Sequence, residues 1–163
     1  MANTNAPFGA IPVSGLGGAL HPQIKVMPKK AGAIYVGDFL EHDAAGSVTV
    51  ADAGSPLIGV AAESRASADT EIAVFVDPEI VYEIQCTGSF VAADCFQNAN
   101  FEATAADTGL SRSKHQVDSA TFNTTATLPL KIIGLSPRQE NEYGSYAKVL
   151  VKINSHILGG GTG

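Results

Sequence analysis

The sequence contains few of the residues from which catalytic and metal sites are usually built. Its 163 residues include no tryptophan, two cysteines and four histidines, and only 16% of them are charged. The formal charge of −6 creates no field that would attract a phosphate backbone, so no nucleic-acid partner is expected. No apolar run approaches the roughly 20 residues of a membrane-spanning helix, and the first residues lack the basic and apolar regions of a signal peptide. We therefore expect no membrane partner and no secretion by a signal peptide.

The residues that could carry chemistry form no motif. The four histidines are spread along the chain without the spacing of metal ligands. Cys86 and Cys95 are too far apart in sequence for a redox dithiol pair, so we expect free thiols, with Cys86 packed in the interior. Glu79 and Glu83 would lie about 13 Å apart on one strand, which favours a solvated face over a catalytic carboxylate pair. The sequence thus predicts no catalytic residues, no cofactor and no metal, and a small hydrolase is the least favoured alternative.

What the sequence does contain is a pattern of short strands and turns. Seventeen glycines and eight prolines interrupt β-branched runs at short intervals. Strands are expected at residues 33–40, 47–50, 57–62, 70–76, 79–86, 128–135 and 145–154. The clearest alternates with a period of two, with Ile80, Tyr82, Ile84 and Cys86 on an apolar face and Glu79, Glu83 and Gln85 on a wetter one. The predicted class is mostly β, a small barrel-like β-tulip or a β-sandwich with few or no helices.

Composition divides the chain into three parts. Residues 1–23 predict an extended N-terminal arm, 24–158 a single β domain, and 159–163 a glycine-rich flexible tail. Within the domain, a polar stretch at about 92–127 predicts a long loop region that could also contain weak edge strands. The charged residues of that stretch form no motif with a mechanism, and we interpret them as surface charge: Asp94, Asp107, Arg112, Lys114 and His115.

The arm is open to two interpretations. It could be a loose terminus, or it could be a strap that orders on a neighbouring subunit. The second is possible because the arm carries apolar anchors at Phe8, Ile11, Val13, Leu16 and Leu20.

The order of several short segments resembles the small structural proteins that tailed phages encode beside the major capsid protein. The resemblance runs from Ala6-Pro7-Phe8-Gly9 through residues 46–61 and 77–85. It is clearest at the end, where LPLKIIGL at 128–135 precedes NEYGSYAKVLVKIN at 141–154. Each segment is weak by itself, and their order together carries the resemblance.

The resemblance implies a capsid decoration, or cement, protein. Such a protein is made in the host cytoplasm, lies on the outer surface of the virion as a homotrimer, and stabilises contacts between subunits of the major capsid protein. The capsid or subunit contacts expected here are Phe8, Ile11, Val13 and Leu16 of the arm and Arg112 and Lys114 of the long loop. The alternative is a head fibre or outer-surface adhesin that binds host envelope or glycan, for which loop aromatics would be expected.

Overall fold

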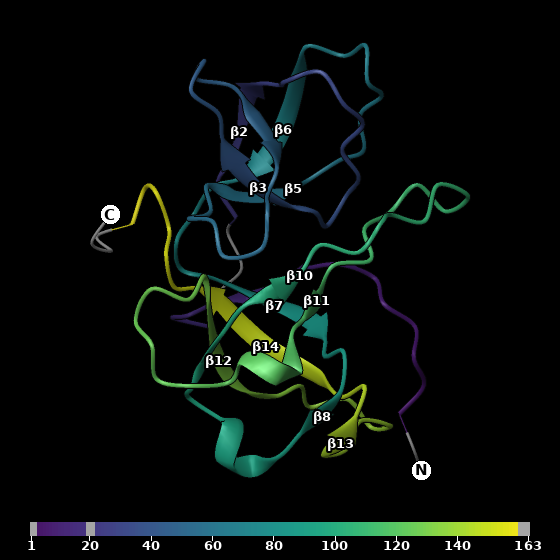
Figure 1. Cartoon of the computed structure of the whole chain (residues 1–163), viewed down its shortest axis with the longest axis vertical. Helices are drawn as coiled ribbons and strands as arrows, with labels where there is room; N and C mark the ends of the chain where they lie inside the picture. The colour runs from purple at the N-terminus through teal and green to yellow at the C-terminus, as the bar shows by residue number, and fades with distance from the viewer. Residues whose placement is uncertain (1–2, 19–21, 160–163) are drawn as a thin grey trace.

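Two five-stranded antiparallel sheets form the framework of the protein. The computed structural model describes residues 3–18 and 22–159, so Leu20 of the arm and nearly all of the predicted tail lie outside the described residues. The first sheet has the order β1 (Ile11–Gly15), β7 (Ile80–Gln85), β14 (Lys148–Ile153), β12 (Leu130–Leu135) and β9 (Asn98–Ala99). The second has the order β2 (Ile24–Pro28), β6 (Glu71–Phe75), β5 (Gly59–Ala61), β3 (Phe39–His42) and β4 (Val48–Val50). Figure 1 shows the second sheet at one end of the long axis and the first sheet towards the other.

Short elements complete the lower part of the molecule in Figure 1. They are the ribbon of β10 (Phe101–Glu102) with β11 (Gln116–Val117), the ribbon of β13 (Gly144–Ser145) with β8 (Ser89–Phe90), and two 3₁₀ turns, η1 (Ala92–Asp94) and η2 (Ser119–Thr121). The predicted loop region therefore contains β9, β10 and β11, and it contributes buried side chains at Phe101 and Val117. None of the described helical segments is long and apolar enough to cross a membrane.

Alternating burial explains why the long strands form where they do. In β14 Val149, Val151 and Ile153 are buried, and the residues between them are half-buried. The larger of two apolar clusters joins these residues to β7 and β12, and it also takes in Phe39 and Val60 of the second sheet. A smaller cluster lies on the other face of the second sheet. The larger core therefore connects the two sheets.

The predicted mostly-β class is confirmed, because strands and isolated β-bridges together make up 41% of the described residues and helical segments 4%. None of the described sheets closes into a barrel, and the choice between a β-tulip and a sandwich stays a prediction. The predicted strand at 33–40 begins only at Phe39. Gly37 explains this late start, because its φ of 89° breaks the extended backbone and lets that backbone lie against Ala10.

The assignment of Glu83 and Gln85 to a wetter face is wrong. Glu83 is 2% exposed and Gln85 is fully buried, whereas the Glu79 side chain is exposed as predicted. The reason is the position of β7, which lies between β1 and β14 in the sheet. The N-terminal arm covers the face that alternation alone would leave to solvent, since the Gln85 amide bonds to arm residues.

Candidate functional site: the arm and its groove

The described part of the arm lies on the chain's own first sheet. The Gln85 side chain accepts a hydrogen bond from the Ala6 amide at 3.0 Å and donates one to the Thr4 carbonyl at 2.8 Å. The Asn3 amide donates to the carbonyls of Glu142 and Ser145. Further along, residues 11–15 pair with β7 as an edge strand. The arm is thus attached by specific polar contacts, and its role as a strap on a neighbouring subunit stays a prediction.

A largely apolar groove of about 330 Å³ lies where the arm passes the second sheet. Its walls include Phe8 and Ile11 of the arm, Val36, Phe75 at the end of β6, and Arg112. Three of the six predicted contact residues, namely Phe8, Ile11 and Arg112, are therefore brought to one site. Ile11 and Val36 remain about 40% exposed, at 42% and 39%, so the groove is open to a partner.

Arg112 is the polar group of this groove. Its backbone is fixed by paired hydrogen bonds with Asp107, and the next amide, that of Ser113, donates to the Val36 carbonyl. Its Nε atom has no hydrogen-bond partner in the described part of the chain and is covered by the protein itself. Within residues 3–18 and 22–159 Arg112 also belongs to no ion pair. No described acid neutralises the charge of Arg112, so a ligand with a negative charge would be favoured at this groove.

The other three predicted contact residues lie elsewhere. Val13 borders a second depression of about 430 Å³, together with Glu83 and Arg138. Leu16 follows β1 with 52% of its surface exposed. The Lys114 ammonium lies 3.9 Å from the Asp107 carboxylate, as a surface ion pair.

An ion pair with a buried carboxylate, which sequence reasoning missed, joins β7 to the 136–144 loop beside the arm. The Arg138 guanidinium donates two hydrogen bonds to the Glu83 carboxylate, one of them from Nε at 2.7 Å. The Ser136 hydroxyl donates to the same carboxylate, and the hydrogen bonds to Glu83 raise the pKa of Arg138. The Phe8 ring lies 6.0 Å from the guanidinium carbon, within the range of a cation–π contact. The arm, β7 and the 136–144 loop, which are far apart in the sequence, therefore meet at this ion pair.

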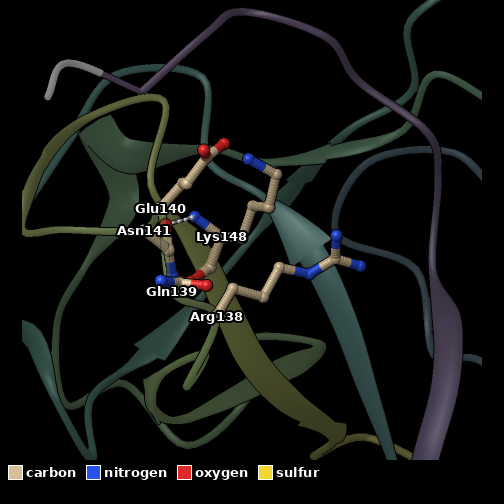
Figure 2. Close-up of a pocket in the computed structure, with 5 residues that line it drawn as sticks. All are labelled: Arg138, Gln139, Glu140, Asn141 and Lys148. Atoms are coloured by element: carbon tan, nitrogen blue, oxygen red, sulfur yellow. Dashed lines mark hydrogen bonds between the residues drawn. The ribbon is translucent and has the colours of Figure 1, made fainter.

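The loop itself forms an open polar depression, shown in Figure 2. The Asn141 side chain holds the loop to β14, because it donates to the Lys148 carbonyl at 2.7 Å and accepts from the Lys148 amide at 2.9 Å. The Arg138 guanidinium points away from the Glu140 carboxylate in this view. The five lining residues thus converge on no common centre.

His115 is not a surface charge, contrary to the sequence interpretation. It is 2% exposed and packs against the rings of Phe39 and Phe101, with centroid distances of 6.0 and 5.5 Å. Its Nδ1 accepts a hydrogen bond from the Phe39 amide, and its Nε2 faces the Asp38 carboxylate at 3.5 Å. Burial lowers the pKa of His115, so the ring is neutral near pH 7, with its proton on Nε2. His115 and Asp38 thus have a packing role at the junction of the two sheets.

The cysteines are free, as predicted. Burial raises the pKa of Cys86 to about 12, which keeps it a thiol. Among the described residues no group of three or more histidine, cysteine or acidic side chains could hold a metal ion. The described residues therefore offer surfaces for binding, with the apolar groove beside Arg112 as the main one.

A comparison with known protein families gives a match that covers the arm and the second sheet. Residues 2–76 match the family model described as phage cement protein. The predicted resemblance to phage capsid cement proteins is confirmed. Neither the curated proteins nor the solved structures give a match.

The match to the cement family covers one part of the site. It includes the arm, β2 to β6 and most of the groove, with Phe8, Ile11 and Phe75. Arg112 and the Glu83–Arg138 pair lie outside it. The cement-like segment thus supplies the apolar walls of the groove, and the remainder of the chain supplies its charge.

Proposed function

We propose that the protein is a structural subunit of the virion that binds the outside of an icosahedral phage head and stabilises contacts between major capsid protein subunits. The observation that carries this proposal is the match of residues 2–76 to the phage cement family, whose role is structural. The protein would act by binding alone. Copies would act together as a homotrimer, so that modest contacts add through avidity.

The edge strands β1 and β2 support capsid binding. Both lie at the end of their sheets, so each has one row of backbone groups without a neighbouring strand. Exposed apolar side chains lie on or beside them: Val13 and Leu16 near β1, and Ile24 and Val26 on β2, where Val26 is 60% exposed. An extended capsid segment could add to such an edge by β-augmentation, with these side chains as anchors. All four residues lie within the cement-family match.

The test is binding to capsids assembled without the protein. Purified wild type should cosediment with these capsids, and cryo-electron microscopy should show it as ordered density spanning capsid subunits. Val26→Glu should bind at least about tenfold more weakly, since it places a charge at an apolar contact. Leu158→Glu, at a similarly exposed position outside the family match, is the matched control and should bind normally. Capsids that stay bare would refute the proposal, and binding to host envelope or glycan instead would favour a fibre or adhesin.

A further inference from the structure

A strained and exposed aromatic residue lies on the loop after η1. Phe96 has a φ of 66°, in the left-handed region that bulky residues rarely adopt, and its side chain is 72% exposed. It has the largest exposed fraction of the exposed large hydrophobic residues in the described part of the chain. Strain of this kind persists only where the surroundings impose it, and it is concentrated at functional positions.

The surroundings of Phe96 hold it in place. Its amide donates to the Ile132 carbonyl of β12 at 3.1 Å, and the Gln97 amide donates to the Asp94 carbonyl. The Gln97 side chain donates to the Ala93 carbonyl at 3.0 Å. The ring is therefore presented from a fixed loop, and an anchor ordered before binding loses little freedom when it binds.

The groove described above has the chemistry that this aromatic anchor requires. Its volume of about 330 Å³ is ample for one aromatic ring, since a cavity of about 150 Å³ already binds benzene. The charge of the groove is also complementary to the charge beside the anchor. Asp94, two residues before Phe96, and Arg112 in the groove each belong to no ion pair among the described residues.

The anchor and the groove of one chain cannot meet each other. Figure 1 shows the coiled ribbon of η1 at the lower end of the molecule, beyond the first sheet, whereas β5 belongs to the second sheet above it, and the groove is lined by Ala61 and Ala62 at the end of β5. We propose that Phe96 of one copy inserts into the groove of a second copy, with Asp94 facing Arg112. This head-to-tail contact uses two different surfaces, so each copy keeps one anchor and one groove for further copies, and a ring closes when the rotation allows. The contact deepens the self-association in the proposed function and does not require a capsid.

The experiment measures association of the full-length protein without capsids, by sedimentation velocity over about 1 µM to 1 mM, a range that covers weak interfaces. Wild type should form assemblies whose mass rises with concentration. Phe96→Ser removes the anchor, and Val36→Glu places a like charge against Asp94 in the groove. Each variant should associate about tenfold or more weakly than wild type. Leu158→Ser and Leu158→Glu are the matched controls, and they should associate as wild type does.

Mixing the two variants gives the decisive result. The intact groove of Phe96→Ser accepts the intact anchor of Val36→Glu, and the remaining surfaces are blocked, so the mixture should form one-to-one dimers and nothing larger. Unchanged circular dichroism and melting temperature show that each variant is folded. A wild type that stays monomeric throughout, variants that assemble like wild type, or a mixture that stays monomeric would each overturn the contact. None of these outcomes depends on capsid binding, so the proposed function is tested separately.

Discussion

The buried pair of Glu83 and Arg138 yields the sharpest prediction about stability. The Glu83 side chain is 3% exposed and that of Arg138 is 54% exposed. Replacing Arg138 with methionine would leave a buried carboxylate with Ser136 as its remaining side-chain donor. Removing one partner of a fully buried pair costs about 3–5 kcal/mol, and the half-exposed guanidinium reduces this to an expected 2–3 kcal/mol, roughly. For a domain of this size the melting temperature should fall by about 4–12 °C.

A double-mutant cycle separates the pair from its surroundings. Glu83→Gln, Arg138→Met and the double variant should give a coupling energy of about 1–2 kcal/mol in urea unfolding followed by circular dichroism. The pair of Glu79 and Lys152 is the control, because its carboxylate belongs to the residue directly before β7 but is 58% exposed, and its ammonium on β14 lies 3.4 Å away. Its coupling should not exceed about 0.5 kcal/mol, as for other surface pairs. Equal coupling in the two cycles would refute the argument that burial gives the Glu83 pair its strength.

Four further predictions follow from other features. Phe96→Asn should raise the free energy of unfolding by about 1 kcal/mol, because asparagine tolerates the left-handed backbone; a loss in urea unfolding would contradict the inferred strain. Burial lowers the pKa of His115 in the folded chain. The contribution of the neutral ring to the free energy of unfolding is therefore complete above the unfolded pKa of about 6.5 and is lost as the pH falls below it. The urea midpoint of the wild type should be lower at pH 5 than at pH 7, and the difference should be smaller for His115→Asn. Gly59→Ala should cost about 2–4 kcal/mol, since the added Cβ would lie 2.0 Å from a β6 carbonyl oxygen, whereas Gly17→Ala, with nothing within 4 Å, should cost under about 0.5 kcal/mol in the same assay. A fragment of residues 1–77 should be unfolded by circular dichroism; a cooperative melt would contradict its dependence on the first sheet.

The strands could be predicted because their signal is local. The β-branched run at 145–154 predicts a strand, and the structure places β14 there, with Val149, Val151 and Ile153 buried. The burial of Glu83 and Gln85 on β7 could not be predicted in the same way. The partner of the buried Glu83 is Arg138, which lies 55 residues further along the chain, and no local pattern encodes that separation.

The groove, too, is built from residues far apart in the sequence, so its assembly could not be predicted from local patterns. Phe8, Ile11 and Arg112 were each predicted as contact residues, on apolar character and charge alone. What brings Arg112 to the arm is a bridge with Val36, 76 residues earlier, and the close approach of Gly9 to Ser113. Phe96 was missed because its significance lies in exposure and a positive φ, and the sequence around it is an ordinary polar loop. A lone aromatic residue in a polar loop is the one signal that could have drawn attention to it.

The cement-like segment depends on the rest of the chain for its shape. β1 pairs only with β7, and Phe39, Leu57 and Val60 are fully buried in a core completed by strands beyond residue 76. Exposing these three side chains would cost about 1.5–3 kcal/mol each, a sum comparable to the whole stability of a small domain. The edge strands proposed to meet the capsid and the groove proposed to meet a second copy are therefore held by one core. A substitution in that core should weaken both contacts together, whereas Val26→Glu and Phe96→Ser should each weaken only one.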